Sequence, residues 1–323
     1  MQESRHRDEI RRIGVEIADF GSRITFATGS DGSGQPEQVR HVRFERPPTP
    51  DEVIDRLGGL YADLGAPMLR SVGVAVWGSV DSLRGMVIDA RFGAEWTDYP
   101  FAQRLSERLG APIYLISGVS AAACAETLVG AGVGRSPLLF VHLGRSVASS
   151  LVVNGQPLVG AAGREGRLGH WQTGVETPRC VCGSYGHLEP LVSAQSLVRL
   201  AIGAAADNDD ALAAIHRVTG VRAEALTAPQ VVTLAAGGIQ PLRELVDHAL
   251  LALSSALANL IVTIDPAMIL IGGPLALADD RYYIWLREAV AVRLSGIADT
   301  PMIGPAKAEP RGALVGALTL QPR

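Results

Sequence analysis

The chain has 323 residues, of which 47% are hydrophobic and 19% charged, and its formal net charge is −4. This composition is ordinary for a globular protein, and the length predicts two lobes. The charge provides no overall attraction to nucleic acid, and the sequence has neither a signal-peptide core nor an apolar run that predicts a membrane span. Because three cysteines do not form a disulfide framework, we expect a cytoplasmic protein without a membrane partner.

Residues 1–12 are predicted to be a polar tail, too short to contain a helix-turn-helix module. Strands then alternate with helices in both halves of the chain, which predicts an α/β fold with two lobes and a cleft between them. We place a small lobe at 13–118 and a large lobe at 119–310. The expected strands are 13–17, 23–27, 39–44, 72–76, 113–116, 138–143, 148–153 and 268–271. The expected helices are 51–64, 101–109, 120–129, 193–206, 209–218, 241–264, 281–294 and 312–320.

A loop in the second half carries two histidines and two cysteines within eighteen residues. They are His170, Cys180, Cys182 and His187. Thiolate sulfur and imidazole nitrogen are the preferred ligands of tetrahedral zinc, and a site with four protein ligands is closed and structural. The loop therefore predicts a structural zinc site, and the alternative is two unrelated thiols beside surface histidines.

The same loop, read as Gly-His, Cys-x-Cys-Gly-x-x-Gly and Leu-Glu, resembles the zinc signature of the ROK family of repressors, open reading frames and sugar kinases. His187 stands where the family usually has a third cysteine. Four further segments resemble family landmarks in the same order, with Trp77 in place of a proline in the first; they are 73–81, 96–100, 121–126 and 265–273. The resemblance implies the actin-like ATPase fold, also called ribonuclease H-like, with the C-terminal helix (311–323) returning to the small lobe. It further implies a sugar ligand and a dimer or tetramer.

The segments that would transfer phosphate depart from the family pattern. Gly118 stands where the resemblance places the catalytic aspartate, and glycine cannot act as a base. The first phosphate loop contains Asp19 and Phe20 where small residues are usual. The second retains Gly144, followed by Arg145, and the adenosine-side turn retains Gly272 and Gly273. We therefore do not expect ATP with Mg²⁺ as a cofactor.

The resemblance also implies which residues contact the sugar. His170 and Glu189 match, and Arg167 replaces a glutamate. Asp89 and Glu95 are the polar candidates where the family's asparagine is missing, and Gly78 is a further candidate ligand contact. A guanidinium only donates hydrogen bonds, so Arg167 suits a ligand that carries a carboxylate or phosphate. Alternatively, Arg167 pairs with a glutamate and closes the site.

These observations favour a catalytically defective sugar-kinase homologue that binds a sugar or sugar derivative in a regulatory or sensor role. It would not contact DNA through this chain. One alternative is an active hexose or N-acetyl-hexosamine kinase with a displaced base. Another is an oligomeric partner protein with a closed pocket.

Overall fold

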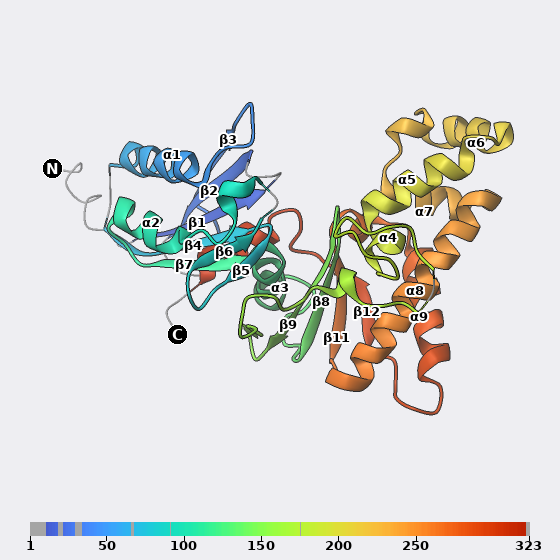
Figure 1. The fold of residues 1–323 in the computed structure, drawn as a ribbon. Coiled ribbons are helices and arrows are strands. Elements are labelled where there is room, and N and C mark those ends of the chain that lie inside the picture. Colours follow the sequence, from blue (N-terminus) through green and yellow to red (C-terminus); the bar gives the residue numbers. More distant parts are fainter. Residues whose placement is uncertain are drawn as a thin grey trace. The chain divides into compact units, whose positions relative to one another are not determined.

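The structure is a computed structural model that describes residues 11–18, 22–29, 34–65, 68–90, 92–174 and 176–320 (Figure 1). The chain forms two compact units. Unit 1 comprises 1–133, 155–165 and 308–323, and unit 2 comprises 134–154 and 166–307. Each unit has its own sheet and hydrophobic core, and each is described below by itself.

A five-stranded sheet in the order β3-β2-β1-β4-β7 forms the centre of unit 1. The first three strands are antiparallel, whereas β1 pairs with β4 and β4 with β7 in parallel. The strands are β1 (Arg11–Ala18), β2 (Arg23–Gly29), β3 (Gln38–Arg43), β4 (Leu69–Val76) and β7 (Ile113–Ser117), and a separate hairpin contains β5 (Ser79–Asp81) and β6 (Met86–Asp89). The helices are α1 (Pro50–Asp63), η2 (Ala94–Trp96), α2 (Phe101–Leu109), α3 (Gly118–Val129) and α10 (Gly312–Thr319).

Period-2 alternation along β1 divides its side chains between two faces of the sheet. Ile13, Val15 and Ile17 enter the larger core, which also contains buried residues of α1 and α2. On the other face, a Cβ added to Gly14 would lie 2.6 Å from Leu318 Cγ of α10. Glycine at this position therefore lets the C-terminal helix pack directly on the sheet.

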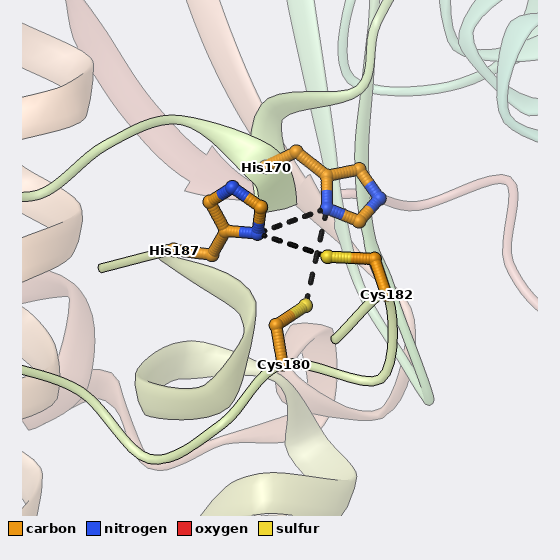
Figure 2. Close-up of side chains that lie close together, drawn as sticks. All are labelled: His170, Cys180, Cys182 and His187. Atoms are coloured by element: carbon orange, nitrogen blue, oxygen red, sulfur yellow. Dashed lines mark hydrogen bonds between the residues drawn. The ribbon is translucent and has the colours of Figure 1, made fainter. Parts of the chain in front are cut away.

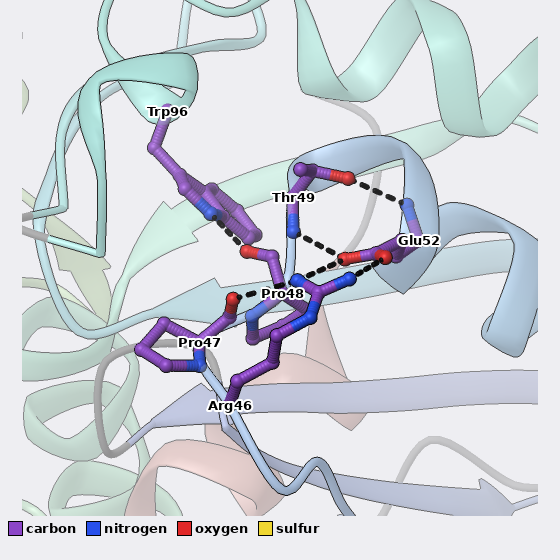
Figure 3. Close-up of polar contacts among 6 residues, drawn as sticks. All are labelled: Arg46, Pro47, Pro48, Thr49, Glu52 and Trp96. Atoms are coloured by element: carbon purple, nitrogen blue, oxygen red, sulfur yellow. Dashed lines mark hydrogen bonds and ion pairs between the residues drawn. The ribbon is translucent and has the colours of Figure 1, made fainter.

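The start of α1 follows the rules of helix capping. Thr49 accepts a hydrogen bond from the Glu52 amide at 3.3 Å, and Glu52 accepts one from the Thr49 amide at 2.8 Å. Arg46 donates to Glu52, and Trp96 Nε1 donates to the Pro48 carbonyl at 2.9 Å (Figure 3). These contacts fix the loop that precedes α1, which begins at Pro50, one residue before the predicted start.

The sheet of unit 2 has the order β9-β8-β11-β12, in which β8 and β9 are antiparallel and β11 is parallel to both neighbours. Its strands are β8 (Leu138–Leu143), β9 (Val147–Val153), β11 (Met268–Gly272) and β12 (Met302–Pro305), and the two-residue β10 (Gln156–Pro157) follows β9. The α-helices are α4 (Glu189–Val192), α5 (Ala194–Ala205), α6 (Asp209–Thr219), α7 (Ala228–Ala236), α8 (Gln240–Ile264) and α9 (Asp280–Leu294). Short 3₁₀ turns are η3 (Leu168–His170), η4 (Ala223–Ala225) and η5 (Pro274–Leu277).

Helix α8 is long and apolar enough to cross a membrane by length and composition alone. However, 56% of its most apolar window is buried inside the protein, and Leu253, Leu257 and Ile261 lie in the core of unit 2. Core helices commonly have this composition, so α8 is weak evidence for a membrane span.

The predicted boundaries of the lobes need two corrections. We expected the small lobe to end at residue 118, but unit 1 continues through α3 to Val133 and also includes 155–165. Helix α3 belongs there because it packs on α10, where a Cβ on Gly316 would overlap the Ala121 carbonyl. The predicted tail (1–12) is also too long, because β1 begins at Arg11, whereas residues 1–10 lie outside the described part of the chain.

Candidate functional site

The four predicted zinc ligands converge in unit 2. One donor atom from each of His170, Cys180, Cys182 and His187 lies within 4.8 Å of the others (Figure 2). His187 Nδ1 is 3.3 Å from both His170 Nδ1 and Cys182 Sγ, and Cys180 Sγ is 3.9 Å from His170 Nδ1. Zinc–ligand bonds of about 2.0–2.3 Å require donors about 3.3–3.8 Å apart at the corners of a tetrahedron. The donor types suit a zinc ion, and the separations of 3.3 Å match a loaded site, whereas the wider separations would have to shorten on binding.

Turns within the loop bring these side chains together. His170 ends η3, and His187 lies two residues before the start of α4, so both histidines are attached to short helical elements. Between the cysteines and His187, the Cys180 amide donates to the Ser184 carbonyl at 2.8 Å. Gly183 and Gly186 have φ angles of +93° and +80°, which side chains with a Cβ rarely adopt. The glycines of the motif thus turn the loop back on itself.

The two thiols have different environments. Burial raises the pKa of the Cys180 thiol, whereas the hydrogen bond from the Ser184 amide lowers the pKa of Cys182. Cys180 is buried and Cys182 is exposed. Because zinc binds thiolates, metal binding would release protons from both groups. A bound zinc would hold the loop in place and leave no open position for chemistry.

Glu189 lies at the start of α4, beside the metal ligands. Its side chain is buried, and Oε2 accepts a hydrogen bond from the Val147 amide of β9 at 3.0 Å. A Cβ on Gly169 would lie 3.0 Å from the same oxygen. Glu189 is a predicted sugar contact, and one of its carboxylate oxygens therefore connects the zinc loop to the sheet. Arg167 directly precedes η3 and is exposed.

Gly118 begins α3 directly after β7, at the predicted position of the missing base. It is buried, and a Cβ added to it would lie 2.6 Å from Trp77 Cδ2. Trp77 Nε1 donates to Glu16 Oε1 at 2.8 Å, and Glu16 is itself buried, with Arg23 Nη1 4.0 Å from its second oxygen. Sequence reasoning did not find this contact. The available signal was the tryptophan at position 77, where the family usually has proline.

The other predicted ligand residues of unit 1 lie at the β5–β6 hairpin. A Cβ on Gly78 would lie 2.6 Å from Ala90 Cα and 2.8 Å from the Asp89 carbonyl. Glycine is therefore required at position 78 by close backbone packing. Asp89 ends β6, pairs in register with Ser79 and is exposed.

The glycines that remain of the nucleotide loops pack on side chains of β8. Added Cβ atoms on Gly144 and Gly272 would overlap the rings of His142 and Phe140, and one on Gly273 would lie 2.9 Å from His142 Cε1. Burial lowers the pKa of His142 to about 4, so its ring is neutral at pH 7. Close packing against β8 therefore accounts for the three glycines, and a bound nucleotide is not needed to explain them. Arg145 is exposed, whereas Asp19 and Phe20 of the first loop lie outside the described residues.

Comparisons with known proteins agree with this architecture. The model of the ROK family matches residues 14–323, and the chain therefore belongs to the ROK family. A glucokinase from Halalkalibacterium halodurans is 31% identical over 214 residues, which cover 66% of this chain and 63% of that enzyme. The DNA-binding transcriptional repressor Mlc of Escherichia coli is 26% identical over 222 residues, which cover 69% of this chain and 53% of the repressor.

Among solved structures, a ROK hexokinase from Thermus thermophilus superposes with a TM-score of 0.76 and 24% sequence identity. The match covers 96% of this chain and 97% of that enzyme. The predicted actin-like ATPase fold is thereby confirmed. The family contains both enzymes and repressors, so membership alone does not decide between the predicted functions.

Proposed function

We propose that this protein is a catalytically defective sugar-kinase homologue that binds a sugar or sugar derivative and acts as a regulator or sensor. One observation carries the proposal: the backbone at Gly118 lies against the Trp77 indole. An aspartate at this position would need the space that the ring occupies. A sugar kinase needs a base for the hydroxyl proton, and its loss typically lowers the rate by a factor of about 10² to 10⁴.

Neighbouring acids do not offer an evident replacement. The two acids closest in sequence to Gly118 are Glu107 and Glu126. Glu107 is exposed on α2 and receives a hydrogen bond from Gln103 at 3.0 Å. Glu126 is buried, and its oxygens accept hydrogen bonds from the amides of Ala131 and Ala308 at 2.8 and 2.6 Å. Its carboxylate is thus engaged in holding the backbone of unit 1, which counts against a displaced base in this segment.

The zinc loop supports the binding half of the proposal. A structural zinc at His170, Cys180, Cys182 and His187 would fix the position of Glu189, which follows two residues after the last ligand. We propose His170, Glu189, Arg167, Asp89 and Gly78 as the ligand-binding residues. The exposed guanidinium of Arg167 favours a sugar with a carboxylate or phosphate group. We further propose that the protein acts in the cytoplasm as a homo-oligomer and without ATP and Mg²⁺.

Thermal unfolding with a panel of ligands tests this function. The panel contains glucose, N-acetylglucosamine, N-acetylmannosamine and their 6-phosphates. A ligand at 100 times its Kd stabilises the folded state by about 2.7 kcal/mol. We expect at least one member to raise Tm, and Arg167→Gln to reduce the effect of the phosphorylated members. Arg164→Gln is the matched control, because Arg164 is also exposed and lies three residues earlier.

A coupled assay of ADP release separates this function from that of an active kinase. We expect no sugar-dependent ADP release with any member of the panel. Turnover of a hexose or N-acetyl-hexosamine would overturn the proposal in favour of the active kinase. A panel without any stabilising ligand would instead favour the oligomeric partner protein with a closed pocket.

A further inference from the structure

We propose that the Trp77 indole is a ligand-contacting surface, which holds a sugar by its apolar C–H face at the place where a catalytic carboxylate would otherwise bind a hydroxyl. This inference rests on the proposed function and deepens it. It assigns a binding role to a residue of unit 1 that the zinc loop does not include. It also names the chemical class of the contact, an aromatic ring against the apolar face of a neutral pyranose.

Two hydrogen bonds fix the position of Trp77 immediately after β4. Its backbone amide donates to the Ile17 carbonyl at 3.1 Å, and its indole Nε1 donates to Glu16 Oε1 at 2.8 Å. Glu16 is buried on β1, so the acceptor is itself held in the sheet. Because the residue is held through its backbone amide and its indole N–H, the side chain loses little further freedom when a ligand binds. This reduces the entropic cost of the contact.

Small residues create the space for this ring. The nearest atoms to a Cβ on Gly118 would be Trp77 Cδ2, Cε2 and Cγ, at 2.6, 2.9 and 2.9 Å. Trp77 also packs against a cluster of buried hydrophobic residues, which comprises Ala75, Ile116, Ala121, Ala313 and Ala317. Four of these five side chains are alanines, so the cluster leaves room for a large aromatic side chain beside it.

The indole is not completely enclosed by this pocket. Trp77 is half-buried, whereas Gly118 beneath it is buried. The N–H, which is the polar group of the ring, is already bound to Glu16. All other atoms of this side chain are carbon. Aromatic side chains in this condition are typical of small-molecule sites, where they supply apolar contact area and a few polar groups fix the orientation.

A double-mutant cycle tests the packing on which this surface depends. Gly118→Ala should lower Tm by about 5 °C, because the added methyl group overpacks the space below the ring. In a Trp77→Leu background, the same substitution should have little effect, since the smaller side chain leaves room. Equal effects of Gly118→Ala in both backgrounds would contradict the contact.

The ligand role is tested with the sugars that stabilise the unaltered protein in the thermal panel. Trp77→Leu should weaken the binding of these sugars by tenfold or more while the zinc content is unchanged. Their addition should change the intrinsic fluorescence of the unaltered protein and of Trp285→Phe, and the change should be smaller in Trp77→Phe, where only the tryptophans elsewhere, such as Trp171 beside His170, can respond. Trp285 is the matched control, because it is also half-buried but lies on α9 of unit 2 under the Arg243 guanidinium.

The two proposals fail in different ways. If a sugar binds Trp77→Leu with unchanged affinity, the contact is refuted and the sensor function stands. If none of the sugars in the panel stabilises the unaltered protein, the sensor function and the contact both fall. The double-mutant cycle then still measures whether Trp77 fills the space at Gly118.

Discussion

The zinc loop of unit 2 and the Trp77–Gly118 contact of unit 1 assemble their key side chains by different means. In the loop, four donors from a short segment converge, and glycines with positive φ close the turns. The decisive partner of Gly118 is Trp77, which lies 41 residues earlier in the chain, directly after β4; Gly118 itself directly follows β7, the strand that pairs with β4. The first arrangement depends on local chain geometry and, when loaded, on a metal. The second depends on how β1, β4 and β7 align.

A locally closed loop and a position in a packed interior therefore accept different kinds of substitution. A loop closed by its own ligands needs few partners elsewhere, so its motif tolerates a change such as histidine at position 187. A position where a parallel strand passes into a helix is surrounded by other side chains, so its occupant has to match the volume that these neighbours leave. Gly118 lies at such a position against the Trp77 indole, whose N–H is satisfied by the acceptor at Glu16.

The largest expected effect is the removal of zinc. Exhaustive treatment with EDTA should lower Tm by about 10 °C, because loss of a metal present at 1,000 times its Kd costs about 4 kcal/mol. Hydrogen exchange should rise first in peptides around His170 and His187, and later, if at all, in β1 and β4. Elemental analysis should find one zinc per chain, and Cys180→Ser should lose it. Cys124→Ala, a change at the buried cysteine of α3, is the control and should keep the zinc.

If the protein is equally stable after the metal has been removed, the four donors are not a structural site. The four side chains would then be brought together by the turns of the loop alone, without a contribution from a metal.

Glu126 provides the corresponding test in unit 1. Glu126→Ala removes the acceptor of two backbone amides inside the protein and should lower the free energy of unfolding by about 3 kcal/mol. Glu126→Gln retains one oxygen and should cost about 1 kcal/mol. Chemical denaturation measures both values. Glu107→Ala on the exposed face of α2 is the control, and an equally large loss there would mean that the burial of Glu126 is irrelevant.

The free energy of unfolding of unit 2 should depend on pH through His142, which is not among the predicted zinc ligands. Because burial lowers the pKa of His142 to about 4, protons bind preferentially to the unfolded chain, whose histidines have pKa values of about 6.5. The contribution of neutral His142 to the free energy of unfolding is fully present above about pH 6.5. It is lost as the pH falls towards 4, which lowers the free energy of unfolding by up to about 3 kcal/mol.

His142→Asn should therefore flatten the decline in unfolding free energy between pH 6.5 and 4, relative to the unaltered protein. Loss of zinc affects both proteins in this range and cancels in the comparison. His216→Asn, on the exposed face of α6, should leave the profile unchanged. An identical decline in all three proteins would show that the environment of His142 does not disfavour its charge.

The smallest effect is expected at a second helical glycine of unit 1. Gly59 lies inside α1 with no heavy atom within 4 Å of an added Cβ. Gly59→Ala should therefore raise the free energy of unfolding by about 0.5–1 kcal/mol, because alanine costs less backbone entropy in a helix. The sign is opposite to that expected for Gly118→Ala. Gly65→Ala is the control, since its φ of +79° makes alanine strained there although space is available.

Several features of the protein could be predicted from the sequence because neighbouring residues determine them. The four donors of the predicted metal site lie close together in the chain, so loop closure costs little and the motif itself indicated that their side chains converge. A helix was expected over 51–64, and α1 spans Pro50–Asp63. The alternation of strands and helices, together with the order of the family landmarks, was sufficient for the two-unit actin-like fold.

The remaining features were decided by contacts between distant segments. The assignment of α3 to unit 1 depends on its packing against α10, nearly 200 residues later in the chain. One oxygen of Glu189 binds the backbone of β9, and Gly78 and Gly272 are required by close packing of Ala90 and Phe140. Such contacts have no local signature, because close packing depends on which atoms meet after the chain has folded. For the same reason the sequence shows a glycine at position 118, whereas only the tertiary structure shows that its backbone lies against the Trp77 indole.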